Sequence, residues 1–213
     1  MKKSVYSLVL MDDVVRAVDA QAGRLGTSRS NLINQILAEH LSCVTPEMRM
    51  KAIFGQVQRL IDTTFQVQQQ SPSAMTFRGS LQYKYHPTIS YRVELNRVPE
   101  RFLGKLSVSI RTQNQKLIRE CTEFFRYRCE MEARELARLG FTDYTAGIGA
   151  GTFTRGLINS GELDDQGAAQ AIYSYISDLD RSLMLWLADV GAFVQSQAEL
   201  EADYREMLRR AVV

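Results

Sequence analysis

The first 44 residues contain one short β-prone run followed by two short amphipathic helices, and this arrangement cannot fold alone. Residues 3–10 alternate in polarity, with Tyr6, Leu8 and Leu10 on one face. Apolar residues then recur at helical spacing on both sides of Gly26, a residue typical of a helix end. A lone strand has no ladder partner, and two short helices cannot cover both their own apolar stripes and the inner face of that strand. We therefore expect a second copy of the chain to complete this unit across a two-fold axis.

Polar residues mark where the two helices begin. We expect Asp12 and Asp13 to cap the first helix, because their carboxylates accept from free backbone N–H groups and suit the positive end of the helix dipole. Ser28 is the expected N-cap of the second helix. The apolar stripe of this second helix consists of Leu32, Ile33, Ile36, Leu37 and Leu41.

The stretch from Val5 to Leu41 resembles the ribbon-helix-helix DNA-binding proteins, the family of the Arc, MetJ and CopG regulators. The resemblance includes the alternating strand and, in the first helix, Val18-Asp19 followed by Ala22. Across the turn it includes Leu25-Gly26-x-Ser28-Arg29-Ser30-x-Leu32-Ile33. It implies an intertwined homodimer whose two-stranded antiparallel ribbon lies in the major groove of double-stranded DNA.

The resemblance also implies which residues contact DNA. The base-facing ribbon positions are Lys3, Val5, Ser7 and Val9. A DNA phosphate is bound by backbone N–H groups at the start of the second helix, at Ser28, Arg29 and Ser30. The two valines depart from the family pattern, because valine contacts a thymine methyl group but cannot read donors and acceptors. Base specificity then depends on Ser7, on apolar contact and on DNA shape, and the alternative is a ribbon that serves mainly for dimerisation.

The chain is predicted to divide into a DNA-binding and dimerisation domain, residues 1–44, and an α+β domain, residues 45–213. The resemblance does not extend to the second domain. Thr45-Pro46-Glu47 is typical of a helix start, and we expect that helix to run through the glutamines at 66–70. Period-two runs at residues 77–85, 89–95 and 106–111 predict a three-stranded antiparallel meander. Long helices at 113–139 and from about 164 onward, the latter breaking near Gly191, are expected to cover its apolar face.

The polar face of this meander is a candidate anion or ligand surface. Its cations are Arg78, Lys84, Arg92 and Arg111, and serines lie among them. An ordinary solvated outer face has the same pattern, so both interpretations stay open. The glycine-rich run at 147–152 lacks the terminal G-K-[ST] of a phosphate-binding loop, and we expect it to connect two helices.

Composition argues against several classes of function. The chain has two histidines and three cysteines without a C-x-x-C pair, so we expect no metal site, no cofactor and no enzymatic activity. Its apolar runs fall short of the roughly 18 residues of a membrane span, and no cleavage site follows the N-terminal apolar stretch. We therefore expect a cytoplasmic protein.

Charge is distributed unevenly along the chain. Residues 45–138 carry sixteen basic and nine acidic groups, a balance that suits polyanion binding, whereas residues 139–213 carry five basic and eleven acidic groups.

Together these features predict a bacterial, dimeric, sequence-specific transcriptional regulator, such as a repressor, that binds double-stranded DNA. Residues 45–213 would sense a small-molecule effector or join dimers into a higher oligomer. The alternative is an antitoxin-like or plasmid-maintenance accessory protein whose C-terminal domain binds a protein partner.

Overall fold

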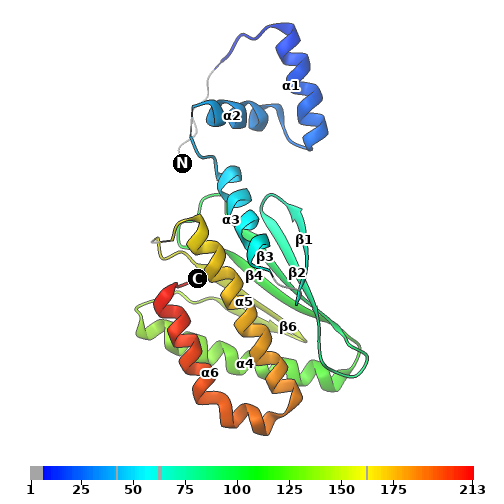
Figure 1. Cartoon of the computed structure of the whole chain (residues 1–213), viewed down its shortest axis with the longest axis vertical. Coiled ribbons are helices and arrows are strands. Elements are labelled where there is room, and N and C mark those ends of the chain that lie inside the picture. Colours follow the sequence, from blue (N-terminus) through cyan, green and yellow to red (C-terminus); the bar gives the residue numbers. More distant parts are fainter. Residues whose placement is uncertain (1–6, 42, 62–63, 162) are drawn as a thin grey trace. The chain divides into compact units, whose positions relative to one another are not determined.

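The computed structural model describes residues 7–41, 43–61, 64–161 and 163–213, which form a six-stranded antiparallel sheet and six helices (Figure 1). The α+β class is therefore confirmed. The chain divides into two compact units, residues 1–49 and residues 50–213. In the described part of the chain, no helix is long and apolar enough to cross a membrane.

The first unit contains the helices α1 (Asp12–Leu25) and α2 (Arg29–His40) and the start of α3 (Pro46–Leu60). The prediction that Asp12 and Asp13 cap α1 is wrong. Met11 is the N-cap residue, and both aspartates lie inside the first turn, where Asp13 pairs with Arg16. Their charges still suit the positive end of the helix dipole. Thr45 caps α3 as expected, since its hydroxyl accepts from the N–H of Met48 at 3.1 Å.

The second unit is built on one sheet. Its strands are β1 (Gln66–Ser71), β2 (Ala74–Ser80), β3 (Thr88–Leu95), β4 (Phe102–Arg111), β5 (Ala146–Gly149) and β6 (Thr152–Ile158). Their order across the sheet is β1-β2-β3-β4-β6-β5, and every neighbouring pair is antiparallel. The predicted meander corresponds to β2, β3 and β4. The sequence patterns therefore identified three of the six strands and missed β1, β5 and β6.

Two of the additional strands arise where we expected other structure. The glutamines at 66–70 do not continue α3, which ends at Leu60, but form β1 and pair with β2. Glutamine favours helix by its intrinsic propensity, so its strand conformation here is decided by pairing with β2 and not by local preference. The glycine-rich run at 147–152 does not connect helices. It belongs to the hairpin of β5 and β6, with Gly151 at a φ of 66° in the turn.

The strand predicted for residues 77–85 ends early, at Ser80. Residues 81–87 form a turn in which Tyr85 and His86 have positive φ angles of 69° and 45°. Lys84 therefore lies in the turn and not on the sheet face, which corrects its assignment to the candidate anion surface.

Helices α4 (Gln115–Arg138), α5 (Asp165–Ala188) and α6 (Val190–Arg210) lie against one face of the sheet (Figure 1). Alternate strand residues, such as Tyr91 and Val108, are buried beneath these helices. The long C-terminal helix breaks near the predicted place, because Asp189 ends α5 and its side chain accepts from the N–H of Gly191 at 2.7 Å. The opposite face of the sheet is polar.

Candidate functional site

The turn between α1 and α2 has a well-defined backbone geometry. Gly26 adopts a φ of 60°, and the next N–H, that of Thr27, donates to the carbonyl of Ala22 at 3.0 Å. This is the Schellman pattern, in which glycine reverses the chain after a helix without the steric cost of a side chain. The turn allows α2 to begin four residues after the end of α1, at Arg29.

The start of α2 presents free backbone donors. The hydroxyl of Ser28 accepts from the N–H of Asn31 at 3.2 Å, as predicted for an N-cap. The N–H groups of Arg29 and Ser30 come before this capped position, and the helix itself offers them no acceptor. The guanidinium of Arg29 binds both carboxylate oxygens of Asp19 in α1, with Nη2 2.6 Å from Oδ2. Its side chain therefore joins the two helices.

The apolar side chains of the first unit are mostly uncovered. Among its described residues, only Ala22, Leu32 and Ala38 are buried hydrophobics. The exposed large hydrophobics of residues 7–44 are Leu8, Val9, Leu10, Met11, Val14, Leu25, Ile36, Leu37, Leu41 and Val44. Such a concentration is far from the scattered apolar exposure of an ordinary monomer surface.

The predicted ribbon lies only partly within the described residues. Lys3 and Val5 lie outside them. Ser7 and Val9 precede α1, are exposed, and take part in no strand pairing within the described chain. The ribbon-helix-helix arrangement therefore stays a prediction.

The predicted anion surface is divided by the sheet register. Arg78 of β2 lies opposite Ser90 of β3, and Arg111 of β4 lies opposite Thr88 of β3, so both arginines flank the same stretch of β3. Together they line a hollow of about 540 Å³. Its lining residues are Thr64, Gln66, Arg78, Gly79, Ser80, Thr88, Ser90 and Arg111.

Arg92, the third predicted cation on this face, is already engaged. Its guanidinium donates to Gln70 of β1 at 2.6 Å and pairs with Glu94 at 2.8 Å. Of the four predicted cations, the structure thus brings Arg78 and Arg111 together in one hollow. It places Arg92 in an ion pair and Lys84 in a turn, where Lys84 lies over the Tyr85 ring.

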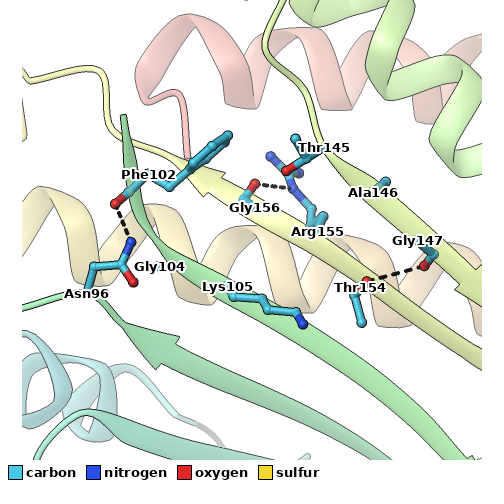
Figure 2. A pocket seen from close by; sticks show the side chains of 10 residues that line it. All are labelled: Asn96, Phe102, Gly104, Lys105, Thr145, Ala146, Gly147, Thr154, Arg155 and Gly156. Carbon is cyan, nitrogen blue, oxygen red and sulfur yellow. Dashed lines mark hydrogen bonds between the residues drawn. The ribbon is translucent and has the colours of Figure 1, made fainter. Parts of the chain in front are cut away.

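A second hollow, of about 430 Å³, lies over β4, β6 and the start of β5 (Figure 2). The Phe102 ring packs on Gly156, because a Cβ atom at that glycine would lie 2.7 Å from the ring. Lys105 is exposed at this hollow. Arg155 also lines it, but the Arg155 guanidinium is buried and pairs with Glu132. The hollow offers mainly backbone and aromatic surface, and one free cation within the described residues.

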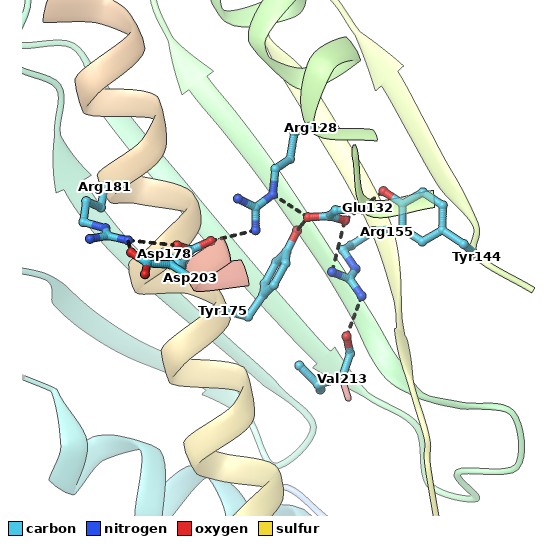
Figure 3. A network of polar contacts seen from close by, with 9 residues as sticks. All are labelled: Arg128, Glu132, Tyr144, Arg155, Tyr175, Asp178, Arg181, Asp203 and Val213. Atoms are coloured by element: carbon cyan, nitrogen blue, oxygen red, sulfur yellow. Dashed lines mark hydrogen bonds and ion pairs between the residues drawn. The ribbon is translucent and has the colours of Figure 1, made fainter. Parts of the chain in front are cut away.

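A buried polar cluster on the helix-covered side was not predicted (Figure 3). Arg128 Nε of α4 donates to Glu132 Oε1 at 2.6 Å, and Arg155 Nη1 of β6 donates to Glu132 Oε2 at 3.1 Å. The hydroxyls of Tyr175 and Tyr144 donate to the same carboxylate at 2.7 and 2.9 Å. The sequence signal was a charged pair at i, i+4 spacing inside the apolar stripe of α4.

The charges in this cluster are held in their ionised forms. Burial alone raises the pKa of Glu132, but Arg155 and Arg128 outweigh it and hold the pKa below its ordinary value. Arg128 also pairs with Asp178 of α5 at 2.8 Å, and Arg155 donates to the carbonyl oxygen of Val213. The cluster joins α4, α5, β6 and residue 213. Arg155 also lines the second hollow, but its guanidinium donates to Glu132 and Val213, so we assign the cluster a structural role.

Comparison of the chain with protein-family models, with curated proteins and with solved structures found no match. Within the described residues, no three histidine, cysteine or acidic side chains gather in a way that could hold a metal ion. The cysteines are also dispersed, with Cys43 exposed, Cys121 buried and Cys129 half-buried. The sites that the geometry offers are the helix pair α1–α2 and the sheet-face hollow.

Proposed function

We propose that the chain is a dimeric, sequence-specific DNA-binding transcriptional regulator. Residues 3–9 of two copies would form a two-stranded ribbon that enters the major groove. The observation that carries the proposal is the uncovered apolar surface of a helix pair joined by a left-handed glycine turn. That combination matches the ribbon-helix-helix pattern in the sequence of residues 5–41.

The apolar surface supports a second copy as the partner. A fully buried Leu, Ile or Val side chain contributes about 1.5–3 kcal/mol relative to an exposed one, so the exposed side chains of α1 and α2 represent a large unused driving force. In an intertwined dimer, each copy covers the other's stripe, and the two ribbon strands supply each other's hydrogen bonds. A single partner molecule then covers the apolar stripes of the helices and supplies the hydrogen bonds of the strand.

The start of α2 supports the placement of a DNA phosphate. The N–H groups of Arg29 and Ser30 and the positive end of the helix dipole form a site that suits an anion. The pairing of Arg29 with Asp19 orients α2 relative to α1, and it leaves the backbone as the direct donor. Ser7 supplies a hydroxyl for the base edges, and Val9 supplies a methyl-contacting surface.

The test is selection of the full chain against a pool of random duplexes at roughly physiological salt, followed by affinity measurements across a salt series. The proposal predicts a palindromic consensus with half-sites in a fixed register. Weak, sequence-blind binding that disappears as salt increases would contradict it. Such a result would direct the search to a protein partner of residues 45–213.

Two variants separate base reading from phosphate positioning. Ser7→Ala should change the selected sequence while leaving affinity for random duplexes unchanged. Arg29→Ala removes the link to Asp19, so it should weaken binding to all duplexes alike. If both variants had the same effect on selected and random DNA, this division of roles would be wrong.

A further inference from the structure

Arg78 and Arg111 are two exposed cations that converge on one hollow of the polar sheet face. They lie on β2 and β4, on either side of β3. The β3 residues opposite them, Ser90 and Thr88, are two positions apart. Strand spacing and rise place their Cα atoms about 12 Å apart, a distance that two arginine side chains span when both bind one small anion.

Among the residues that the structure describes, neither guanidinium has an acidic partner that would neutralise it. In the described ranges, Arg78 and Arg111 form no ion pair, in contrast to Arg92, which binds Gln70 and Glu94. Hydroxyl groups complete the hollow. Those of Thr88 and Ser90 lie between the two arginines on β3, and that of Ser80 lies at its edge.

We propose that this hollow binds a compact, phosphate-bearing small molecule, with Arg78 and Arg111 holding the phosphate and the hydroxyls of Thr88 and Ser90 donating to its remaining oxygens. A phosphate monoester carries a charge of about −1.5 to −2 at neutral pH, which matches two guanidinium groups. The oxygens of a phosphate group point in different directions, so they can accept hydrogen bonds from the arginines on either side and from the hydroxyls between them.

The charge pattern favours a small ligand over a nucleic-acid strand. A strand needs a continuous basic track, but the middle of this face is neutralised by the Arg92–Glu94 pair. The volume of about 540 Å³ lies within the range of small-molecule sites. This site is separate from the proposed DNA-binding function, and its test contains no DNA.

The test measures binding of inorganic phosphate to the full chain by ³¹P NMR titration at constant ionic strength. We expect saturable binding that weakens about tenfold in Arg78→Gln and in Arg111→Gln, because each removes a charge-assisted hydrogen bond. Lys84→Gln is the matched control, since it removes the same charge from the nearby turn and should leave phosphate binding unchanged. The amide signals of Thr88 and Ser90 should shift on phosphate addition in the unaltered chain and in Lys84→Gln, and should need about tenfold more phosphate to shift in Arg78→Gln and Arg111→Gln.

Three outcomes would overturn the proposal. One is the absence of saturable phosphate binding, and another is an equal loss in all three variants. The third is tighter binding of a dicarboxylate such as succinate, or of a short single-stranded oligonucleotide, than of phosphate. That result would assign the hollow to a different class of ligand.

Discussion

The carboxylate of Glu132 lies between two buried guanidinium groups and accepts from two tyrosine hydroxyls. A buried pair is weak evidence for a net gain in stability over an apolar core, but removing one member leaves the others uncompensated. Arg128 and Arg155 are both 1% exposed, so water cannot replace the missing charge. Even a conservative substitution of Glu132 should therefore lower the free energy of unfolding substantially.

We predict that Glu132→Gln lowers the free energy of unfolding by about 3–5 kcal/mol, measured by urea denaturation at neutral pH. Because the pKa of Glu132 is lowered in the folded chain, its contribution is present above the ordinary Glu range and is lost as pH falls through the folded pKa. The stability difference between the two proteins should therefore shrink in acid. Glu130→Gln, an exposed position on the same helix, is the control and should change stability little.

Asp180 should show the opposite pH dependence. It is 8% exposed and accepts from the Tyr91 hydroxyl at 2.6 Å, and burial raises its pKa although that hydrogen bond acts to lower it. The folded chain therefore favours the protonated form, and stability falls as pH rises through the folded pKa. We predict that Asp180→Asn raises the thermal unfolding temperature at neutral pH and that the gain disappears in acid. An equal gain at all pH values, or a gain in the exposed control Glu123→Gln, would contradict this.

At the scale of elements, the close approach of β3 and β4 depends on Gly104. A Cβ atom at this position would lie 2.2 Å from the backbone oxygen of Glu94, which cannot move without disturbing the ladder. We predict that Gly104→Ala lowers the free energy of unfolding by at least about 1–3 kcal/mol, by chemical denaturation. In Gly55→Ala no atom lies within 4 Å of the new methyl, so helix α3 should gain about 0.5–1 kcal/mol. Similar effects of the two changes would show that Gly104 is not a close-packing site.

The helix pair yields a prediction about assembly. Ile36 is 47% exposed in a single copy, so Ile36→Lys should cost one chain little but should place a charge inside the proposed dimer interface. Sedimentation equilibrium should give twice 24.2 kDa for the unaltered chain and 24.2 kDa for the variant. Val98→Lys, at a position 50% exposed in the second unit, should remain a dimer. A monomeric unaltered chain would contradict the interface.

Sequence patterns identified elements whose signal is local. The stripe of α4, the Ser28 cap, the Gly26 turn and strands β3 and β4 follow from periodicity and capping chemistry, and the structure confirms them. Strands β1, β5 and β6 were missed. Glutamine and glycine carry little strand preference, so the conformation of β1 and β5 is decided by pairing with β2 and β6. Sequence reasoning identified the cations of the hollow only in part. The register across three strands brings Arg78 and Arg111 together, and the turn at residues 81–87 removes Lys84 from the sheet face.

At the scale of the whole molecule, the two units present different kinds of surface. The first exposes apolar side chains that suit a second copy, and the second encloses a complete core and exposes a polar sheet face. The proposed division of labour assigns dimerisation and DNA contact to the first and phosphate binding to the second. Each assignment can fail without the other, because the phosphate titration contains no DNA and the selection contains no phosphate-bearing small molecule.

The most direct measurement compares the affinity of the full chain for the selected duplex with its affinity for the same duplex with one half-site scrambled. Each mismatched base pair costs about 1–3 kcal/mol, so losing several contacts of one ribbon strand should weaken binding by about a hundredfold or more. Two copies should bind each intact duplex. Equal affinity for both duplexes, with one copy bound to each, would contradict a dimer that reads DNA through a shared ribbon.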